Sequence, residues 1–248
     1  MKKLLIALCM LPGMVLASSG GHLDHVAIDL SDKESLKRGA QTFVNYCLSC
    51  HGADYVRYNR IGRDLGMSDE EVTAMISTRD AKGDPSKPGE LMKVAMNNDY
   101  AKTAFGTKIP GLSVIARARG ADWLYTYLRT FYVDESRPTG VNNIAFPDVG
   151  MPHVLWELQG LQKAKFVTET DADGNEQKIF EGMELVVPGK MKPEEYDAYV
   201  ADLVNFMVYM GEPMQMERKS LGVWVLLFLF VFTVIAYLLK KEYWKDVH

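Results

Sequence analysis

The sequence predicts a mainly α-helical exported domain with a small β-hairpin excursion, followed by one C-terminal transmembrane helix. Three observations lead to this fold class. Apolar side chains recur at helical spacing in several stretches of residues 18–220, and residues 221–239 form an uncharged apolar run. A shorter apolar run at the N-terminus has the form of an export signal.

The N-terminus has the parts of a secretory signal. Residues 1–3 form a short basic head, residues 4–16 are apolar, and Ala17 supplies a small residue at a cleavage site. An uncleaved anchor fits this segment less well, because the apolar run is short and is interrupted by Pro12. We therefore predict a signal peptide over residues 1–17 and export of the remaining chain.

The C-terminal run, residues 221–239, predicts a membrane-spanning helix. Its 19 residues would extend roughly 28 Å, close to the hydrocarbon thickness of a bilayer. Basic residues flank it, and Trp224 and Tyr237 lie near its ends, where amphipathic rings prefer the interface. A buried core helix without a polar stripe would need protein on every side. The export signal sets the orientation: residues 18–220 in the periplasm, and a cytoplasmic tail of residues 240–248.

The exported part is acidic. Residues 18–239 contain 23 basic and 30 acidic side chains, a net charge near −7. Nucleic acid selects basic surfaces, so this balance argues against nucleic-acid binding and is compatible with a basic protein partner. About 200 residues suffice for one domain with a sizeable core.

Two cysteines of the mature chain lie in one short motif. Cys9 belongs to the signal, which leaves Cys47 and Cys50 in the sequence Cys47-Leu48-Ser49-Cys50-His51. The C-x-x-C-H spacing is that of haem attachment, in which two thiols on one turn bond the vinyl groups and the histidine becomes an axial ligand. The motif predicts one covalently bound haem c, with His51 as a ligand of the iron.

Two alternatives for these thiols are a redox-active dithiol and a zinc site. A thioredoxin-like dithiol would follow a strand, whereas a helix is predicted before this motif. Residues 31–34 read as a capping box, and apolar residues then recur at helical spacing from Leu36 to Cys47. A structural zinc site would need a second pair of ligands, and the mature chain has no further cysteine.

The sixth ligand of the iron has several candidates, because the chain has 14 methionines. Met151 is favoured because it lies in a loop between Gly150, which lets the backbone approach closely, and Pro152, which stiffens the chain. His153 and Met183 are the next candidates. Methionines on the apolar stripe of a late helix are more typical of core filling: Met207, Met210 and Met214. Ligation by histidine and methionine suits electron transfer rather than the binding of a gas.

Further helices are predicted around this motif. Residues 68–79 open with a second capping box, residues 122–131 have one apolar face, and residues 193–211 begin at a proline and end at a glycine. We expect Gly39 on the first helix to give a close-approach notch for the last of these. Residues 165–187 differ, because alternating side chains around Asp173-Gly174 predict a β-hairpin of unassigned role.

The order of signal, haem motif, methionine loop and C-terminal anchor closely resembles the cytochrome c1 family in its proteobacterial form. The resemblance covers nearly the whole chain. It also rests on specific stretches: Cys47-Leu48-Ser49-Cys50-His51 followed by Asp54-Tyr55-Val56, Leu112-Ser113 with Arg117-Ala118-Arg119-Gly120, Arg137-Pro138-Thr139-Gly140, and Gly150-Met151-Pro152.

The resemblance implies a class I cytochrome c-like haem domain and a set of site residues. Cys47 and Cys50 would be the thioether sites, His51 the proximal ligand and Met151 the distal one. Arg119 would hold a haem propionate, for which a guanidinium fork is well suited. The chain departs from the family at Ile109-Pro110-Gly111, where Pro-Pro-Asp is common.

The family role is electron transfer within the quinol–cytochrome c oxidoreductase (bc1) complex. The expected donor is a Rieske iron–sulfur subunit, the acceptor a soluble or tethered cytochrome c, and the neighbour of the anchor in the lipid bilayer is cytochrome b. Such a subunit performs no catalysis alone. Four alternatives compete with this assignment: a tethered cytochrome c shuttle, a haem subunit of a terminal oxidase, a tethered thiol–disulfide oxidoreductase, and a haem sensor that binds a gas.

Overall fold

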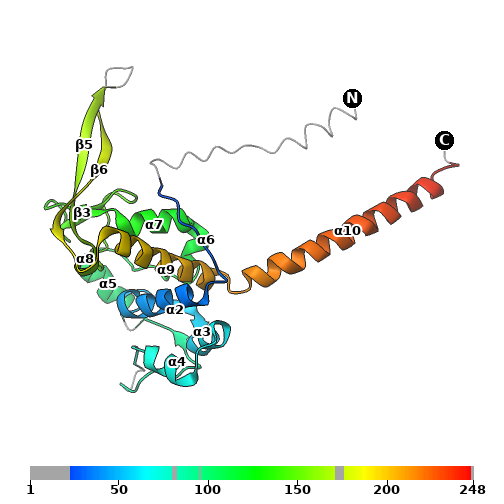
Figure 1. Ribbon diagram of the computed structural model, residues 1–248, viewed down its shortest axis with the longest axis horizontal. Coiled ribbons are helices and arrows are strands. Elements are labelled where there is room, and N and C mark those ends of the chain that lie inside the picture. Colours follow the sequence, from blue (N-terminus) through cyan, green and yellow to red (C-terminus); the bar gives the residue numbers. More distant parts are fainter. Residues whose placement is uncertain (1–22, 80–82, 95, 171–175, 247–248) are drawn as a thin grey trace.

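The computed structural model describes residues 23–79, 83–94, 96–170 and 176–246. A mainly helical domain carries two projections, a long β-hairpin and an isolated C-terminal helix (Figure 1). This is the predicted fold class. The signal peptide predicted over residues 1–17 lies outside the described residues.

The domain is built on a pair of crossed helices, α2 (Lys33–Thr42) and α9 (Pro193–Gly211). A Cβ atom at Gly39 would collide with the carbonyl oxygen of Asp202 and would lie 2.7 Å from Cβ of Phe206. The predicted notch is therefore confirmed: only glycine lets the two backbones come this close. Around the crossing, fully buried side chains from both helices and from Phe43, directly after α2, form the centre of the core: Leu36, Ala40, Phe43, Val200, Leu203 and Phe206.

The predicted capping box at residues 31–34 is wrong. The helix begins one residue later, because Asp32 is the N-cap and its carboxylate accepts a hydrogen bond from the backbone N–H of Ser35 over 3.0 Å. Ser31 is instead part of a turn in which its hydroxyl donates to Asp29. Aspartate and serine are equally good caps, so the sequence alone does not choose between them.

A π-helical turn, η1 (Phe43–Cys47), connects α2 to the cysteine motif. The backbone N–H of Leu48 donates to the carbonyl of Phe43, five residues earlier, over 3.0 Å. Such single π turns inside helices occur frequently at functional sites. Here the turn leads directly into Cys47.

Short helices and strands fill the middle of the chain: β1 (Ala53–Arg57), α3 (Tyr58–Leu65), α4 (Asp69–Met75), β2 (Leu91–Met92), α5 (Asn98–Phe105), α6 (Ile115–Arg119), α7 (Ala121–Arg129), β3 (Phe131–Val133), β4 (Val141–Asn143) and α8 (Trp156–Gln159). β1 pairs with β2 and β3 with β4, both antiparallel.

Two of the predicted helices are present but shorter. The capping box at Ser68 is confirmed, since Ser68 and Glu71 exchange hydrogen bonds of 2.7 and 3.2 Å. This helix ends at Met75 rather than at residue 79, because Ile76 is extended. The helix predicted over residues 122–131 is α7, which ends at Arg129, and Phe131 opens strand β3.

The predicted hairpin is confirmed and is longer than residues 165–187. Strands β5 (Gly160–Thr170) and β6 (Glu176–Pro188) pair antiparallel and project from the domain (Figure 1). The turn predicted at Asp173-Gly174 lies outside the described residues. Successive side chains of a strand face opposite ways, so Phe166 and Val167, both exposed, lie on opposite faces of the hairpin.

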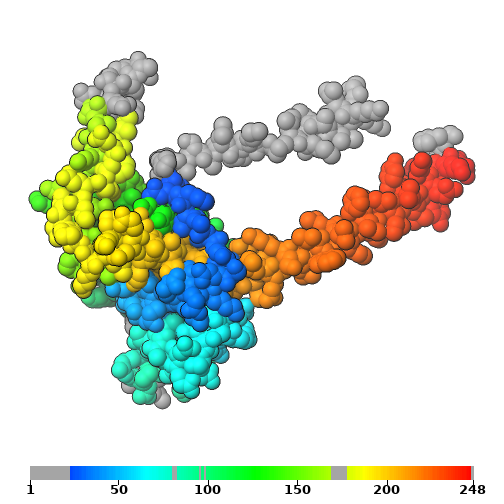
Figure 2. Space-filling model, in the orientation of Figure 1, coloured from blue at the N-terminus to red at the C-terminus, as the bar shows by residue number. Residues whose placement is uncertain are grey.

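The C-terminal helix α10 (Gln215–Tyr243) has 29 residues, is uncharged over the predicted run 221–239, and buries no side chain against the domain. Figures 1 and 2 show it extending from the domain as a separate rod. At ~1.5 Å per residue it is about 43 Å long, which exceeds the hydrocarbon thickness of a bilayer. Within the described chain it is the one helix long and apolar enough to span a membrane.

Candidate haem site

The cysteine motif forms a tight turn at the end of η1. The backbone N–H groups of Cys50 and His51 both donate to the carbonyl oxygen of Cys47, over 3.1 and 2.8 Å. Both cysteines carry free thiols. The turn therefore presents two thiols and one imidazole from five consecutive residues.

The ring of His51 is fixed by one hydrogen bond. Its Nδ1 lies 2.8 Å from the backbone carbonyl oxygen of Pro110. A carbonyl oxygen only accepts, so Nδ1 carries the proton and Nε2 keeps its lone pair. Burial lowers the pKa of His51, which favours the neutral ring. A neutral imidazole with a free Nε2, held through Nδ1–H by a carbonyl, is the usual arrangement of a metal-binding histidine.

The thiol of Cys47 does not suit redox exchange. Burial raises the pKa of this thiol to about 12, and the neighbouring Cys50 adds to the shift. Reactive dithiols have a lowered pKa, because the thiolate is the nucleophile. A zinc site is equally unsupported, since no group of three or more histidine, cysteine or acidic side chains gathers among the described residues.

The motif opens into a cavity of about 400 Å³. Cys47, Cys50, His51, Met151 and Arg119 all line it, although Met151 is 100 residues from His51 in the chain. The rest of the wall is mostly aliphatic and aromatic: Tyr46, Phe105, Thr107, Lys108, Ile109, Pro110, Leu112, Ile115, Trp123, Leu124, Tyr127, Leu128, Phe146, Val149, Gly150, Pro152, Val154, Leu203 and Met207. An apolar slot with two thiols, an imidazole, a thioether and a guanidinium fits a haem with acidic side groups.

Several side chains outside the sequence predictions hold the loop that carries Met151. The amide oxygen of Asn143 accepts from the N–H groups of Ala145 and Phe146, over 2.9 and 3.1 Å. The amide oxygen of Asn142 accepts from the N–H of Asp148 over 2.8 Å. Sequence pattern alone gives little sign of these roles, because asparagine is common in loops for many reasons.

Arg137 holds the same loop from outside. Its guanidinium donates to the carboxylate of Asp148 over 2.7 Å and to the carbonyl of Asp148 over 3.0 Å. Asp148 has a φ of 63°, a left-handed conformation that few non-glycine residues adopt. Arg137 belongs to one of the stretches that carry the family resemblance, so the sequence did indicate that this residue has a specific role.

Gly150 is less constrained than its pattern suggested. A Cβ atom there would lie 3.5 Å from the carbonyl oxygen of Phe105, an ordinary contact distance. The protein around Gly150 therefore does not by itself require glycine.

The other candidates for the sixth ligand lie elsewhere. His153 is buried outside the cavity lining, with its ring stacked on Phe131 at 4.9 Å, and burial lowers its pKa to about 4. Met183 lies on strand β6, opposite Ala164. Met207, expected to be core filler, lines the cavity from α9 and is also part of the core.

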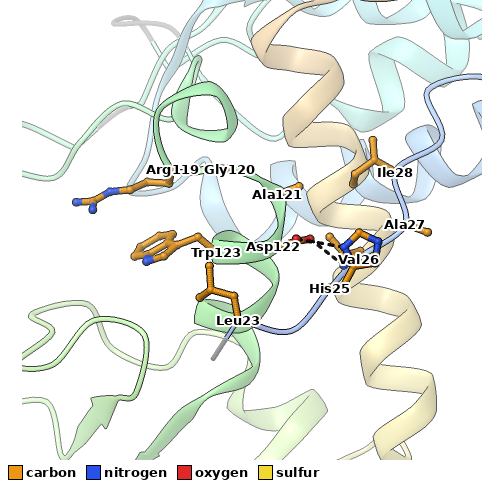
Figure 3. Close-up of a pocket in the computed structure, with 10 residues that line it drawn as sticks. All are labelled: Leu23, His25, Val26, Ala27, Ile28, Arg119, Gly120, Ala121, Asp122 and Trp123. Atoms are coloured by element: carbon orange, nitrogen blue, oxygen red, sulfur yellow. Dashed lines mark hydrogen bonds and ion pairs between the residues drawn. The ribbon is translucent and has the colours of Figure 1, made fainter. Parts of the chain in front are cut away.

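Arg119 lies at the C-terminal end of α6 with its guanidinium carbon 4.9 Å from the ring centroid of Trp123. It also lines a second pocket, between α7 and the segment of residues 23–28 (Figure 3). Figure 3 shows Arg119 and Trp123 pointing away from Asp122. Asp122 instead accepts from the N–H of Val26 over 2.9 Å and pairs with His25. Arg119 is therefore oriented toward the cavity side of α7 rather than toward its neighbouring carboxylate.

The fold, the long apolar helix and this cavity fit the class of membrane-anchored haem proteins. The family model described as "Cytochrome C1 family" matches residues 25–247. The chain belongs to the cytochrome c1 family. It is accordingly a haem subunit of a bc1 complex, in which its partners are cytochrome b and a Rieske iron–sulfur protein.

Two relatives match the whole length of the chain, and a third matches most of it. Cytochrome c1 of Allochromatium vinosum is 48% identical over 100% of both chains. The ammonia monooxygenase gamma subunit of Nitrosomonas europaea is 51% identical over 100% of this chain and 98% of its own. Cytochrome c1 of Rhodospirillum rubrum is 28% identical over 87% of this chain and 83% of its own.

Proposed function

We propose that the chain carries one covalent haem c as an electron-transfer centre. In this proposal Cys47 and Cys50 would hold the haem through thioether bonds to its two vinyl groups. His51 and Met151 would bind the iron, and Arg119 would pair with a propionate. The observation that carries the proposal is that these five side chains, from three separate parts of the chain, line one apolar cavity.

The protein's own residues would position the ligands. The bond from His51 Nδ1 to the Pro110 carbonyl leaves Nε2 free to bind the iron, and Asn142, Asn143 and Arg137 hold the Met151 loop. Haem supplies a one-electron carrier when bound, and ligation by histidine and methionine raises its potential. The expected electron donor is the Rieske subunit, and the expected acceptor is a soluble or tethered cytochrome c.

The proposed topology has the haem domain, residues 18–220, in the periplasm. Helix α10 crosses the inner membrane, and the tail of residues 240–248 is cytoplasmic. The apolar length of α10 supports the membrane span. The export signal expected at residues 1–17 supports the orientation. Reporter fusions test it: alkaline phosphatase fused after residue 214 should be active, and the same enzyme fused after residue 248 should be inactive.

The first experiment is a reduced-minus-oxidised visible spectrum of the full chain purified with its partners in mild detergent. Bands of both c-type and b-type haem are expected, because a bc1 complex contains cytochrome b. A c-type signal alone in several detergents would favour a tethered shuttle or an oxidase subunit. Absence of any haem signal, with two titratable thiols, would overturn the haem proposal itself.

The name of the Nitrosomonas relative suggests a second assembly, a monooxygenase of ammonia. The same purified complex discriminates between the two. A bc1 assembly reduces cytochrome c with a quinol, whereas the alternative requires ammonia-dependent oxygen consumption that copurifies with this chain.

A further inference from the structure

We infer that Tyr127 is a positioning residue for Met151: its hydroxyl donates a hydrogen bond to the thioether sulfur and thereby raises the reduction potential of the site. The oxygen of Tyr127 lies 3.3 Å from Sδ of Met151, and both side chains line the cavity. The inference rests on the proposed role of Met151 as an axial ligand.

The ring of Tyr127 is held on two sides. Trp123 stacks on it with centroids 5.0 Å apart and planes 13° from parallel, and Phe131 meets it edge to face at 5.2 Å. Trp123, Tyr127 and Phe131 follow one another at a spacing of four residues, the first two on α7 and the third at the start of β3. The hydroxyl therefore has little freedom to turn away from the sulfur.

Asn143 ties the helix that carries Tyr127 to the loop that carries Met151. Its side-chain N–H donates to the backbone carbonyl of Tyr127 over 2.7 Å. Its side-chain oxygen accepts the N–H groups of Ala145 and Phe146, which lead into the Met151 loop. Asn143 is almost fully buried, so these bonds are shielded from competing water. The donor and the acceptor of the inferred bond are thus positioned by one shared residue.

The chemistry sets the direction of the effect. A thioether sulfur has two lone pairs, so it can bind a metal with one and accept an O–H with the other. Accepting the O–H draws electron density away from the sulfur and weakens its donation to the metal. Weaker donation favours the reduced iron, which carries less positive charge.

The test is Tyr127→Phe in the full complex, because phenylalanine keeps the ring contacts and removes only the hydroxyl. We expect the midpoint potential to fall by ~28 mV. This corresponds to about a threefold change in the oxidised-to-reduced ratio at ~59 mV per decade. The charge-transfer band of methionine-bound ferric haem should persist, and the unfolding temperature should stay close to that of the wild type. Tyr125→Phe is the matched control, because Tyr125 lies on α7 against Arg129 and is not among the residues that line the cavity. The midpoint potential of this variant should equal that of the wild type.

A double-mutant cycle separates this inference from the proposed ligation. If Tyr127 acts through the sulfur, Tyr127→Phe should have no further effect on the potential of Met151→Leu. An unchanged or raised potential in Tyr127→Phe, with the charge-transfer band present, would overturn the inference and leave Met151 as ligand. A wild-type potential in Met151→Leu would instead overturn the ligation on which it rests.

Discussion

Nδ1 of His51 donates to the backbone carbonyl of Pro110 over 2.8 Å, across the loop where the chain departs from its family pattern. The orienting partner is thus a main-chain atom, which any residue supplies. This explains how Ile109-Pro110-Gly111 can stand where Pro-Pro-Asp is common without loss of the histidine's anchor. Ile109 and Pro110 also remain part of the cavity wall.

Pro110→Ala should therefore retain haem and potential close to those of the wild type. Losing a partner of this kind typically costs ~10–100-fold in metal affinity, but here the carbonyl remains. Haem content per protein and a redox titration check this expectation. His51→Ala is the reference for full loss of the ligand. If Pro110→Ala behaved like His51→Ala, the side chain rather than the carbonyl would be positioning the ring.

Met151→Leu should lower the midpoint potential by more than the ~59 mV that corresponds to a tenfold change, and should allow carbon monoxide to bind the reduced protein. The reason is that leucine fills the same volume but supplies no ligand. Met207→Leu is the control, since Met207 also lines the cavity and is a methionine. Redox titration and carbon monoxide difference spectra measure both variants. The assignment fails if Met207→Leu, and not Met151→Leu, produces these changes.

The sequence predicted the parts of this protein that depend on local chemistry. Each of these parts depends on residues close together in the sequence: the C-x-x-C-H turn, the capping box at Ser68, the proline-initiated helix α9 and the apolar run of α10. The notch at Gly39 was also predictable, because a glycine amid an apolar helical stripe indicates close packing. Its partner, Asp202, was not.

The parts that the sequence did not predict depend on contacts between distant segments. Strands β2, β3 and β4 have two or three residues each, too few for a period-two pattern. The bond from Tyr127 to Met151 joins residues 24 apart, and the bond from His51 to Pro110 joins residues 59 apart. In the sequence alone, Asn142 and Asn143 cannot be told from ordinary loop residues, because their role depends on hydrogen bonds to the Met151 loop.

Gly39→Ala should destabilise the domain, because the added methyl group would collide with the carbonyl oxygen of Asp202 where α2 crosses α9. Overpacking of this kind costs about 1–3 kcal/mol. Gly89→Ala is the control: nothing lies within 4 Å of the added Cβ, and its effect should stay within about 0.5 kcal/mol. Thermal unfolding in detergent, followed by circular dichroism, compares the two. Equal unfolding temperatures for Gly39→Ala and the wild type would contradict the close crossing.

The contact between residues 23–28 and α7 should weaken at acidic pH. The N–H of Val26 donates to the carboxylate of Asp122 over 2.9 Å, and this bond, with a further contribution from His25, holds the pKa of Asp122 below its usual value. Because the pKa is lowered in the folded state, the stabilisation is complete above about pH 4 and is lost as pH falls through the lowered pKa. Hydrogen exchange at Val26, corrected for its intrinsic pH dependence, should therefore become faster in that range.

Asp122→Ala should speed this exchange about fivefold at neutral pH, as expected for a bond of ~1 kcal/mol. Asp122→Asn keeps an oxygen acceptor but cannot titrate, so it should remove the acid dependence while leaving the protection at neutral pH largely in place. Protection of Val26 in the wild type that did not change between pH 5 and the acid range would show that Asp122 does not hold this segment.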